Sequence, residues 1–367
     1  MNMNNKNWVS VWGNAVSIAE HHPEAYAKYI TLRYPVYIPF DGDTLRFTFD
    51  NYCGSEAVTV TRATVSAATS PVYEKMPLAC PCKKETICDI TFSKNESVTM
   101  EAHQTAVSDP VSFPVKKGMT LTVSLYFADF TLMQSAVLIT GPLSKGFFSL
   151  GDQTHADALP MDTTKTTNWF YFLSNIELMT AEENHTVICY GDSITAGAWP
   201  DYLTLLARQN PDNHTAFIRR ATSGSRVLRQ YECITYDSYG LKGTNRFPHE
   251  IPTTGADTVI IQQGINDIIH PIGIETNPFR PMSDLPTAKE LIDGYRYYIE
   301  EAKKLHLKVY MGPLLPIFGW RTYATFRDDL RNELNAWIRS AKEIDGCIDF
   351  DLALRGSENP SAFREGF

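Results

Sequence analysis

Residues 185–199 read HTVICYGDSITAGAW, and they place Ser193 two residues after a short apolar run that ends at Gly191. The apolar run predicts a buried β-strand, and the glycine allows the chain to turn sharply away from it. Ser193 would then begin a helix, where the helix dipole and free N–H groups favour an oxyanion. The same serine could serve only as a helix N-cap, which is a common role. Ser193 is therefore a candidate nucleophile, and such a serine needs a base to take its proton.

Two sequence patterns divide the 367-residue chain near residue 180. From about residue 43 to residue 141, apolar and polar residues alternate, as in TLRFTFDNY (44–52) and TLTVSLYFAD (120–129). Short turn-forming stretches separate these runs, and little helical pattern accompanies them. We therefore predict a β-sandwich-like accessory domain over residues 1–180.

After residue 180, apolar strands alternate with amphipathic helices. The predicted strands are HTVICYG, TVIIQQG, LKVYMGPLLP and CIDFD, and the predicted helices span about 287–305 and 324–342. This alternation predicts an α/β domain over residues 181–367, with a parallel sheet covered by helices on both faces. In such sheets, sites form beyond the carboxyl ends of the strands.

Two further strand ends carry residues suited to an acyl-transfer site. The turn RRATSGSRV (219–227) contains Gly224, where a backbone N–H could approach a substrate closely. The run IIQQGINDIIHP (260–271) places Gly264 and Asn266 after a strand, and an asparagine amide can donate to a developing oxyanion. Alone, Gly224 could be a plain turn glycine and Asn266 a helix cap, but three such strand ends together favour a site.

GDSIT (191–195), the Gly224 turn and GIND (264–267) resemble blocks I, II and III of the SGNH (GDSL-type) hydrolases. The resemblance implies a flavodoxin-like three-layer α/β/α domain that hydrolyses esters. It also implies that Ser193 is the nucleophile and that the oxyanion hole consists of the Ser193 N–H, the Gly224 N–H and the Asn266 amide.

The resemblance extends to positions around these blocks and to the first half of the chain. Gly191, Asp192 and Gly264 take supporting positions in the motifs. The stretches WVSVWGNA (8–15) and GDQTHAD (151–157) resemble the β-rich domain that precedes the hydrolase domain in a bacterial subgroup of the family.

The family's fourth block, an Asp-x-x-His after the last strand, supplies the base and the acid that orients it. Residues 346–367 resemble the strand and loop that lead to this block, so we expect it beyond residue 367. Asp-x-x-His spacing occurs within the chain at Asp152…His155 and Asp267…His270, and both are interpreted as decoys. His270 nevertheless follows the predicted oxyanion residue Asn266. It is a candidate substitute base or substrate contact, or it only begins the turn at the next proline.

Two carboxylates remain near the end of the last predicted strand. Asp349 and Asp351 could orient a histidine, but without one they are expected to be solvated strand-end groups.

Composition restricts the partners. The formal charge of −9 argues against nucleic acid or an anionic membrane as partner. No run of about 18 apolar residues predicts a membrane span, and no apolar segment at the start predicts a secretory signal, so a cytoplasmic location is expected.

The seven cysteines are expected to be free thiols. Cys80, Cys82 and Cys88 lack a clear fourth zinc ligand and favour an exposed loop, so no metal or other cofactor is expected.

These observations favour a serine esterase that hydrolyses short-chain esters through an acyl-enzyme on Ser193. The resemblance implies O-acetyl esters, with a carbohydrate or another small molecule as the partner. Trp199 or Trp320 could stack on a sugar ring, or both could be core residues. The alternative is a catalytically weak SGNH scaffold that binds a glycan or a protein.

Overall fold

The computed structural model describes residues 6–18, 26–230, 239–272 and 280–366. The described residues form two compact units. The first draws on Met1–Val187, Ala196–Arg220 and Thr253–Ala256, and the second on Ile188–Thr195, Ala221–Pro252 and Asp257–Phe367. The predicted domain boundary between residues 180 and 181 stays a prediction.

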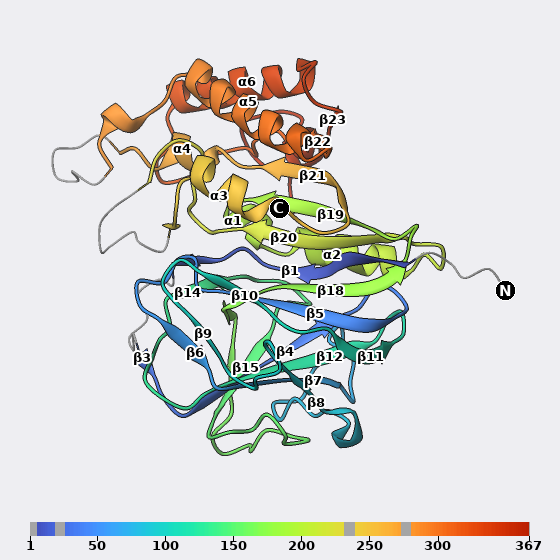
Figure 1. The fold of residues 1–367 in the computed structure, drawn as a ribbon. Coiled ribbons are helices and arrows are strands. Elements are labelled where there is room, and N and C mark those ends of the chain that lie inside the picture. The colour runs from blue at the N-terminus through green and yellow to red at the C-terminus, as the bar shows by residue number, and fades with distance from the viewer. Residues whose placement is uncertain (1–5, 19–25, 231–238, 273–279, 367) are drawn as a thin grey trace. The chain divides into compact units, whose positions relative to one another are not determined.

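The N-terminal part of the chain is rich in β-strands (Figure 1). One sheet contains β1 (Lys6–Gly13), β18 (Leu173–Ala181), β5 (Gly42–Asp50) and β10 (Thr105–Val107) in that order, and β11 (Val111–Val115) also pairs with β5. A six-stranded sheet has the order β16 (Lys165–Thr167), β15 (Gly146–Leu150), β4 (Ile30–Tyr37), β12 (Thr120–Phe127), β7 (Arg62–Ala67) and β8 (Cys88–Ile90). The sandwich arrangement itself stays a prediction.

Short strands and one 3₁₀ turn complete this region. The smaller sheets are β17 (Trp169–Tyr171) with β14 (Ser135–Leu138) and β2 (Ser17–Ile18), β13 (Thr131–Leu132) with β3 (Tyr26–Ala27), and β6 (Val58–Val60) with β9 (Val98–Met100); the 3₁₀ turn spans Lys84–Thr86.

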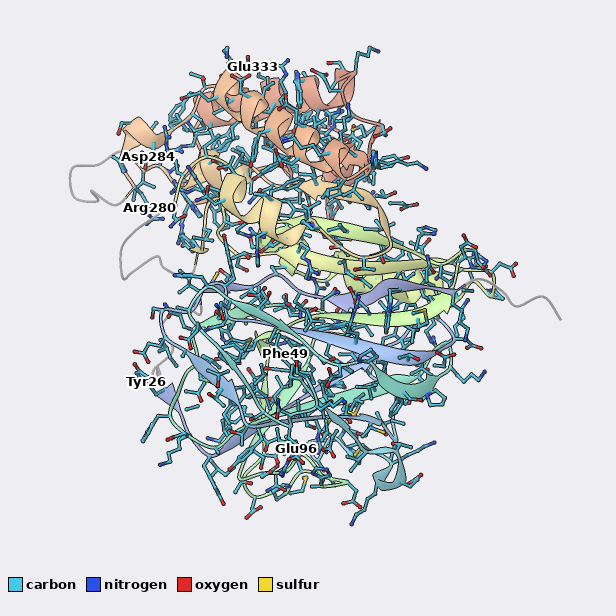
Figure 2. The ribbon with its side chains drawn as sticks, viewed as in Figure 1. Tyr26, Phe49, Glu96, Arg280, Asp284 and Glu333 are labelled. Carbon is cyan, nitrogen blue, oxygen red and sulfur yellow. The ribbon has the colours of Figure 1, made fainter. Side chains whose placement is uncertain are left out.

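The alternating pattern of β5 has the predicted effect on burial. Leu45, Phe47 and Phe49 are all buried, and Figure 2 shows Phe49 in the interior of the first unit. In β12 the polar side chains are buried as well as the apolar ones. Their burial is possible because they form hydrogen bonds with other buried groups. Thr122 shares a hydrogen bond of 2.5 Å with the Ser66 hydroxyl.

The cysteine cluster differs from its prediction of an exposed loop. Cys80 and Cys82 are buried, and Cys80 packs in a core cluster with Met76, Phe147 and Leu159. Thiols behave as small apolar groups, which explains their burial here. The cysteines of the described residues are free thiols, whereas Cys233 lies outside the described residues.

The second half of the chain is mixed α/β. Its sheet has the order β20 (Thr215–Ala221), β19 (His185–Gly191), β21 (Ala256–Gln262), β22 (Lys308–Met311) and β23 (Gly346–Cys347). The pairs β21–β22 and β22–β23 are parallel, as predicted. The helices are α1 (Ser193–Ala196), α2 (Trp199–Arg208), α3 (Gly243–Glu250), α4 (Ile265–Ile269), α5 (Ala288–Lys304), α6 (Thr325–Ser340) and α7 (Phe350–Leu354), and a 3₁₀ turn spans Met282–Asp284.

The two long predicted helices are confirmed as α5 and α6. Helix α5 begins with a capping box, in which the Thr287 hydroxyl accepts a hydrogen bond from the Glu290 N–H and the Glu290 carboxylate accepts one from the Thr287 N–H. Helix α5 packs against α3, α6 and β22. None of the described helices has the length and apolar character needed to cross a lipid bilayer.

The predicted strand CIDFD is wrong beyond Cys347. Asp349 caps α7, and its carboxylate accepts a hydrogen bond of 2.9 Å from the Leu352 N–H. An aspartate at this position satisfies a free N–H of the first helical turn, and the chain therefore becomes helical after β23.

Candidate active site

A cavity of about 390 Å³ in the second unit brings together residues from separate strand ends. Four of the predicted site residues line it, namely Ser193, Gly224, Asn266 and His270. Gly191, Asp192 and Gly264 do not line it and support it from the adjoining backbone. The remaining lining residues are Ile194, Tyr239, Ile265, Ile269, Leu315, Pro316, Ile317, Trp320, Arg321 and Phe363.

Ser193 lies two residues after the end of β19 and is the first residue of α1. The strand can end this way because residue 191 is glycine: a Cβ there would collide with the Gln262 carbonyl and the Thr195 hydroxyl. Asp192 is buried, and its carboxylate accepts a hydrogen bond of 3.0 Å from the Ile194 N–H. Ser193 itself is exposed, so its hydroxyl is accessible from the cavity.

Gly224 lies in a tight turn that only glycine fits well. Its φ is +76°, in the left-handed region, and a Cβ would collide with the Tyr239 ring. Three side chains form hydrogen bonds to the next residue, Ser225. Its carbonyl accepts one of 3.0 Å from the Asn266 amide, and its hydroxyl accepts one of 2.8 Å each from Arg246 and Gln263. The Gly224 N–H therefore has a fixed position at the cavity.

Asn266 and Asp267, in the GIND motif, form hydrogen bonds to the turn that contains Gly224 and to the residues that follow it. Asn266 is buried in α4 and donates to Ser225, and no described residue accepts its second amide N–H. The Asp267 carboxylate accepts hydrogen bonds from the Val227 N–H (2.8 Å) and the Leu228 N–H (3.0 Å). This role of Asp267 was not predicted from the sequence, although its place in the GIND motif could have indicated it.

Gly264 allows α4 to begin close to α5. Its φ is +126°, and a Cβ would collide with the Tyr295 hydroxyl. That hydroxyl donates a hydrogen bond of 2.8 Å to the Gln263 carbonyl. The end of β21 is thus fixed to α5 immediately before Asn266.

His270 directly follows α4 and is buried against an aromatic ring. Its ring stacks on Tyr239, with 5.0 Å between the ring centroids. Burial, followed by the charges of Arg226, Arg280 and Arg321, lowers the pKa of His270 to about 3. The imidazole is therefore neutral at physiological pH, and it is a weak acceptor of protons.

Asp192 and Asp267, the aspartates of the two motifs, also have pKa values above the ordinary one. Burial raises the pKa of Asp192 to about 7, and the Asp267 carboxylate adds to this effect. Burial raises the pKa of Asp267 to about 6, although its hydrogen bonds to Val227 and Leu228 oppose the change. Both groups lie behind the cavity lining and orient the backbone.

Asp192 makes stability depend on pH. Its folded pKa lies above the ordinary 3.8, so its contribution to stability is fully present below about pH 4 and is lost as the pH rises through about 7. Between pH 5 and pH 8, we expect the free energy of unfolding of the unmodified protein to fall by about 2–3 kcal/mol more than that of Asp192→Asn. Urea denaturation at several pH values measures this. Asp212→Asn, at an exposed position, is the control, and parallel profiles for the unmodified protein and Asp192→Asn would contradict the burial account.

Asp351 is not the solvated carboxylate that the sequence predicted. It is buried in α7 and forms ion pairs with Arg331 (2.9 Å), Arg339 (2.6 Å) and Arg355 (3.3 Å). Asp349 is partly exposed and pairs with Arg339 at 2.7 Å. The arginines come from α6 and the end of α7, which local sequence did not place beside this segment. Neither aspartate lines the cavity.

The other Asp-x-x-His pair lies in the β-rich unit. The His155 ring pairs with the Asp89 carboxylate at 3.0 Å, and Asp152 pairs with Arg62 at 2.7 Å. His21 and His22 lie outside the described residues. Among the described residues, His270 is the one histidine that lines the cavity. The described part of the chain contains no cluster of three or more metal-ligating side chains.

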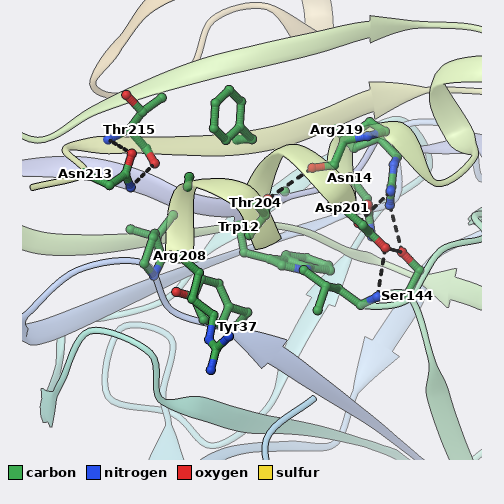
Figure 3. Close-up of a pocket in the computed structure, with 17 residues that line it drawn as sticks. Trp12, Asn14, Tyr37, Ser144, Asp201, Thr204, Arg208, Asn213, Thr215 and Arg219 are labelled. Carbon is green, nitrogen blue, oxygen red and sulfur yellow. Dashed lines mark hydrogen bonds and ion pairs between the residues drawn. The ribbon is translucent and has the colours of Figure 1, made fainter. Parts of the chain in front are cut away.

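A smaller cavity of about 40 Å³ lies in the first unit (Figure 3). Its polar wall contains Arg219, which pairs with Asp201 at 2.7 Å, and Ser144, which donates to Asp201 at 2.9 Å. These groups satisfy one another, and the volume suits a few water molecules. We assign no substrate to this cavity.

A comparison with known protein families agrees with the motifs. Residues 189–366 match the model of the GDSL-like Lipase/Acylhydrolase family. No curated protein matches the chain. Similar solved structures include a GDSL-like lipase from Bacteroides thetaiotaomicron, with 20% identity, a TM-score of 0.35, and coverage of 50% of this chain and 75% of that chain.

Two other solved structures span more of the chain. A family two carbohydrate esterase from Cellvibrio japonicus has 10% identity and a TM-score of 0.33, and the match covers 95% of this chain and 89% of that chain. An active-site mutant of a family two carbohydrate esterase from Clostridium thermocellum has 11% identity and a TM-score of 0.33, and the match covers 94% and 88%.

Proposed function

Because residues 189–366 belong to the GDSL-like lipase/acylhydrolase family, we propose that the protein is a serine esterase with Ser193 as its nucleophile. The proposed substrates are short-chain esters, in particular O-acetyl groups on a carbohydrate. One observation carries the proposal: Ser193, Gly224 and Asn266 come from three separate strand ends and line one cavity.

In the proposed reaction, the Ser193 oxygen attacks the carbonyl carbon of the ester. The negative charge that develops on the carbonyl oxygen accepts hydrogen bonds from the Ser193 N–H, the Gly224 N–H and the Asn266 amide. The departing alcohol oxygen takes up the proton that Ser193 loses, which leaves an acyl-enzyme on Ser193. Water then attacks the acyl carbon, releases the acid and returns a proton to the Ser193 oxygen. Proton transfer is assigned to none of the described residues.

Fixed donors support this assignment. Transition-state stabilisation by an oxyanion hole depends on donors that need no rearrangement during the reaction. Ser225 is held by Asn266, Arg246 and Gln263, so the neighbouring Gly224 N–H stays in place. Arg246 is itself fixed by a buried ion pair of 2.8 Å with Glu250.

His270 suits substrate contact better than proton transfer. A general base works best with a pKa near the working pH, and the pKa of His270 is lowered to about 3. Its ring is stacked on Tyr239 and its position is fixed by a hydrogen bond of 3.1 Å from its backbone N–H to the Asn266 carbonyl. We propose that the neutral ring contacts the bound ester.

Trp320 supports a carbohydrate as the alcohol. It lines the cavity with its side chain about half exposed, as a platform for the apolar face of a sugar ring requires. Trp199, the other candidate, lies in α2 and does not line the cavity. The cavity is larger than an acetyl group, which leaves room for part of the alcohol.

Acetate release from a monoacetylated methyl glycoside and from 4-nitrophenyl acetate tests the proposed function. We expect Trp320→Ala to raise KM for the sugar ester about fivefold, with a smaller change in kcat, and Trp320→Phe to recover part of the loss. Phe326→Ala removes a comparably exposed aromatic ring outside the cavity and serves as the control. If neither ester is hydrolysed, the esterase proposal fails and binding by a weak scaffold becomes the better account.

We also propose the three-layer flavodoxin-like arrangement for this domain. With β19 counted as the first strand, the order β20-β19-β21-β22-β23 reads 2-1-3-4-5, which is the flavodoxin-like order. The site residues follow the carboxyl ends of β19, β20 and β21, where such folds bind ligands.

A further inference from the structure

The cavity carries a positive charge in a chain whose formal charge is −9. Arg321 is the one charged side chain among the described residues that line it. It is exposed, and the described residues offer it no carboxylate partner. Its guanidinium lies 5.5 Å from the centroid of the Trp320 ring.

The other charges near the cavity differ from Arg321 in their surroundings. Arg226 and Arg280 act on His270 together with Arg321. The Asp267 carboxylate attracts Arg226 and offsets its charge. Neither Arg226 nor Arg280 lines the cavity, so Arg321 is the charged side chain that a bound ester would meet there.

The wall that bears Arg321 is anchored to α6 and to the segment around Ser361. The Leu314 N–H donates a hydrogen bond of 2.7 Å to Asn335, and the Leu314 carbonyl accepts bonds from Asn335 (2.9 Å) and Arg331 (3.2 Å). The Phe318 N–H donates to the Ser361 carbonyl at 2.8 Å. These bonds fix the segment 314–321 on the same cavity as Ser193.

We propose that the ester hydrolysed in this cavity carries a carboxylate, which pairs with Arg321. This inference rests on the proposed function and specifies its substrate class. A guanidinium presents paired N–H donors that match a carboxylate, and such charge-assisted bonds are about twice as strong as neutral ones. The carboxylate belongs either to the alcohol, as in an acidic sugar, or to the acyl group.

Two pairs of esters separate these sources. On the alcohol side, 4-acetoxybenzoate is compared with its neutral analogue 4-acetoxybenzamide. On the acyl side, mono-4-nitrophenyl adipate is compared with 4-nitrophenyl hexanoate. We expect kcat/KM to favour the charged member of at least one pair about tenfold, and the pair that shows the preference identifies the source.

Substitutions at Arg321 test its role. In Arg321→Gln the ratio of kcat/KM between the charged and the neutral ester should fall about tenfold, and Arg321→Lys should restore part of it. Arg296→Gln removes a partly exposed arginine on α5 outside the cavity and should keep the ratio of the unmodified protein. Raising the salt concentration from 50 mM to 500 mM should weaken the preference of the unmodified protein more than that of Arg321→Gln.

The outcomes distinguish this inference from the proposed function. Turnover of the neutral esters without a charge preference, or a preference that Arg321→Gln leaves intact, would overturn the inference and leave the esterase standing. If no ester is hydrolysed, calorimetric binding of 4-hydroxybenzoate and adipate decides. Binding that Arg321→Gln abolishes would support the carboxylate site although the esterase fails, and no binding would overturn both.

Discussion

Ser193→Ala is expected to lower kcat/KM for 4-nitrophenyl acetate at least about 10³-fold, because it removes the only atom that the proposal allows to form the acyl-enzyme. Binding and the oxyanion donors alone leave a residual rate of about 10³–10⁴ over water when such a nucleophile is lost. The serine is exposed, so we expect the free energy of unfolding to change by less than about 0.5 kcal/mol.

A matched serine elsewhere controls for nonspecific effects. Ser340→Ala removes an exposed serine hydroxyl at the end of α6 and should retain the activity of the unmodified protein. Equal rates in Ser193→Ala and the unmodified protein would mean that the measured turnover does not pass through Ser193.

Asn266→Ala should lower kcat for the same ester about 10²–10³-fold with a smaller change in KM. An oxyanion donor acts mainly in the transition state, and this pattern follows when one is lost. The substitution also removes the hydrogen bond to the Ser225 carbonyl, so we expect a loss of about 1 kcal/mol in the free energy of unfolding.

Asn51→Ala separates the two effects. Asn51 is buried in the β-rich unit and its amide also bonds backbone groups, the carbonyls of Met100 and Glu101, but it does not line the cavity. It should destabilise the protein at least as much as Asn266→Ala while the folded protein loses much less kcat. A similar loss of kcat in both variants would argue that Asn266 acts only through structure.

The strand ends that form the site could be predicted because short, local sequence patterns mark them. A short apolar run followed by Gly191 marks one strand end, and Gly264 marks another. Parallel strands bring their carboxyl ends to one edge of a sheet, so residues far apart in sequence meet there. Ser193, Gly224 and Asn266 could therefore be grouped from the amino-acid sequence alone, and one cavity holds all three.

The surroundings of these residues could not be predicted, because they depend on long-range packing. Arg246 and Gln263 reach Ser225 from α3 and from the end of β21, and no local pattern marks either as a partner. The burial of Asp351 follows from arginines on α6, and that of Cys80 from a core cluster in the β-rich unit. Sequence pattern alone treats a carboxylate such as that of Asp351 as solvated.

The chemical state of His270 is a second property that only the structure gives. Its place after Asn266 favoured a substrate contact or the start of the turn at Pro271 over a substitute base, and the sequence could not decide among these roles. Burial and three neighbouring arginines lower its pKa to about 3, which favours the substrate contact.

Labelling with a fluorophosphonate, followed by intact mass measurement and peptide mapping, tests the central claim most directly. The reagent reacts with an activated serine nucleophile and does not require a particular ester to be known. The account predicts one adduct per chain, located on Ser193 and absent from Ser193→Ala. An unlabelled protein, or an adduct on a different serine, would contradict the assignment of Ser193 as the nucleophile.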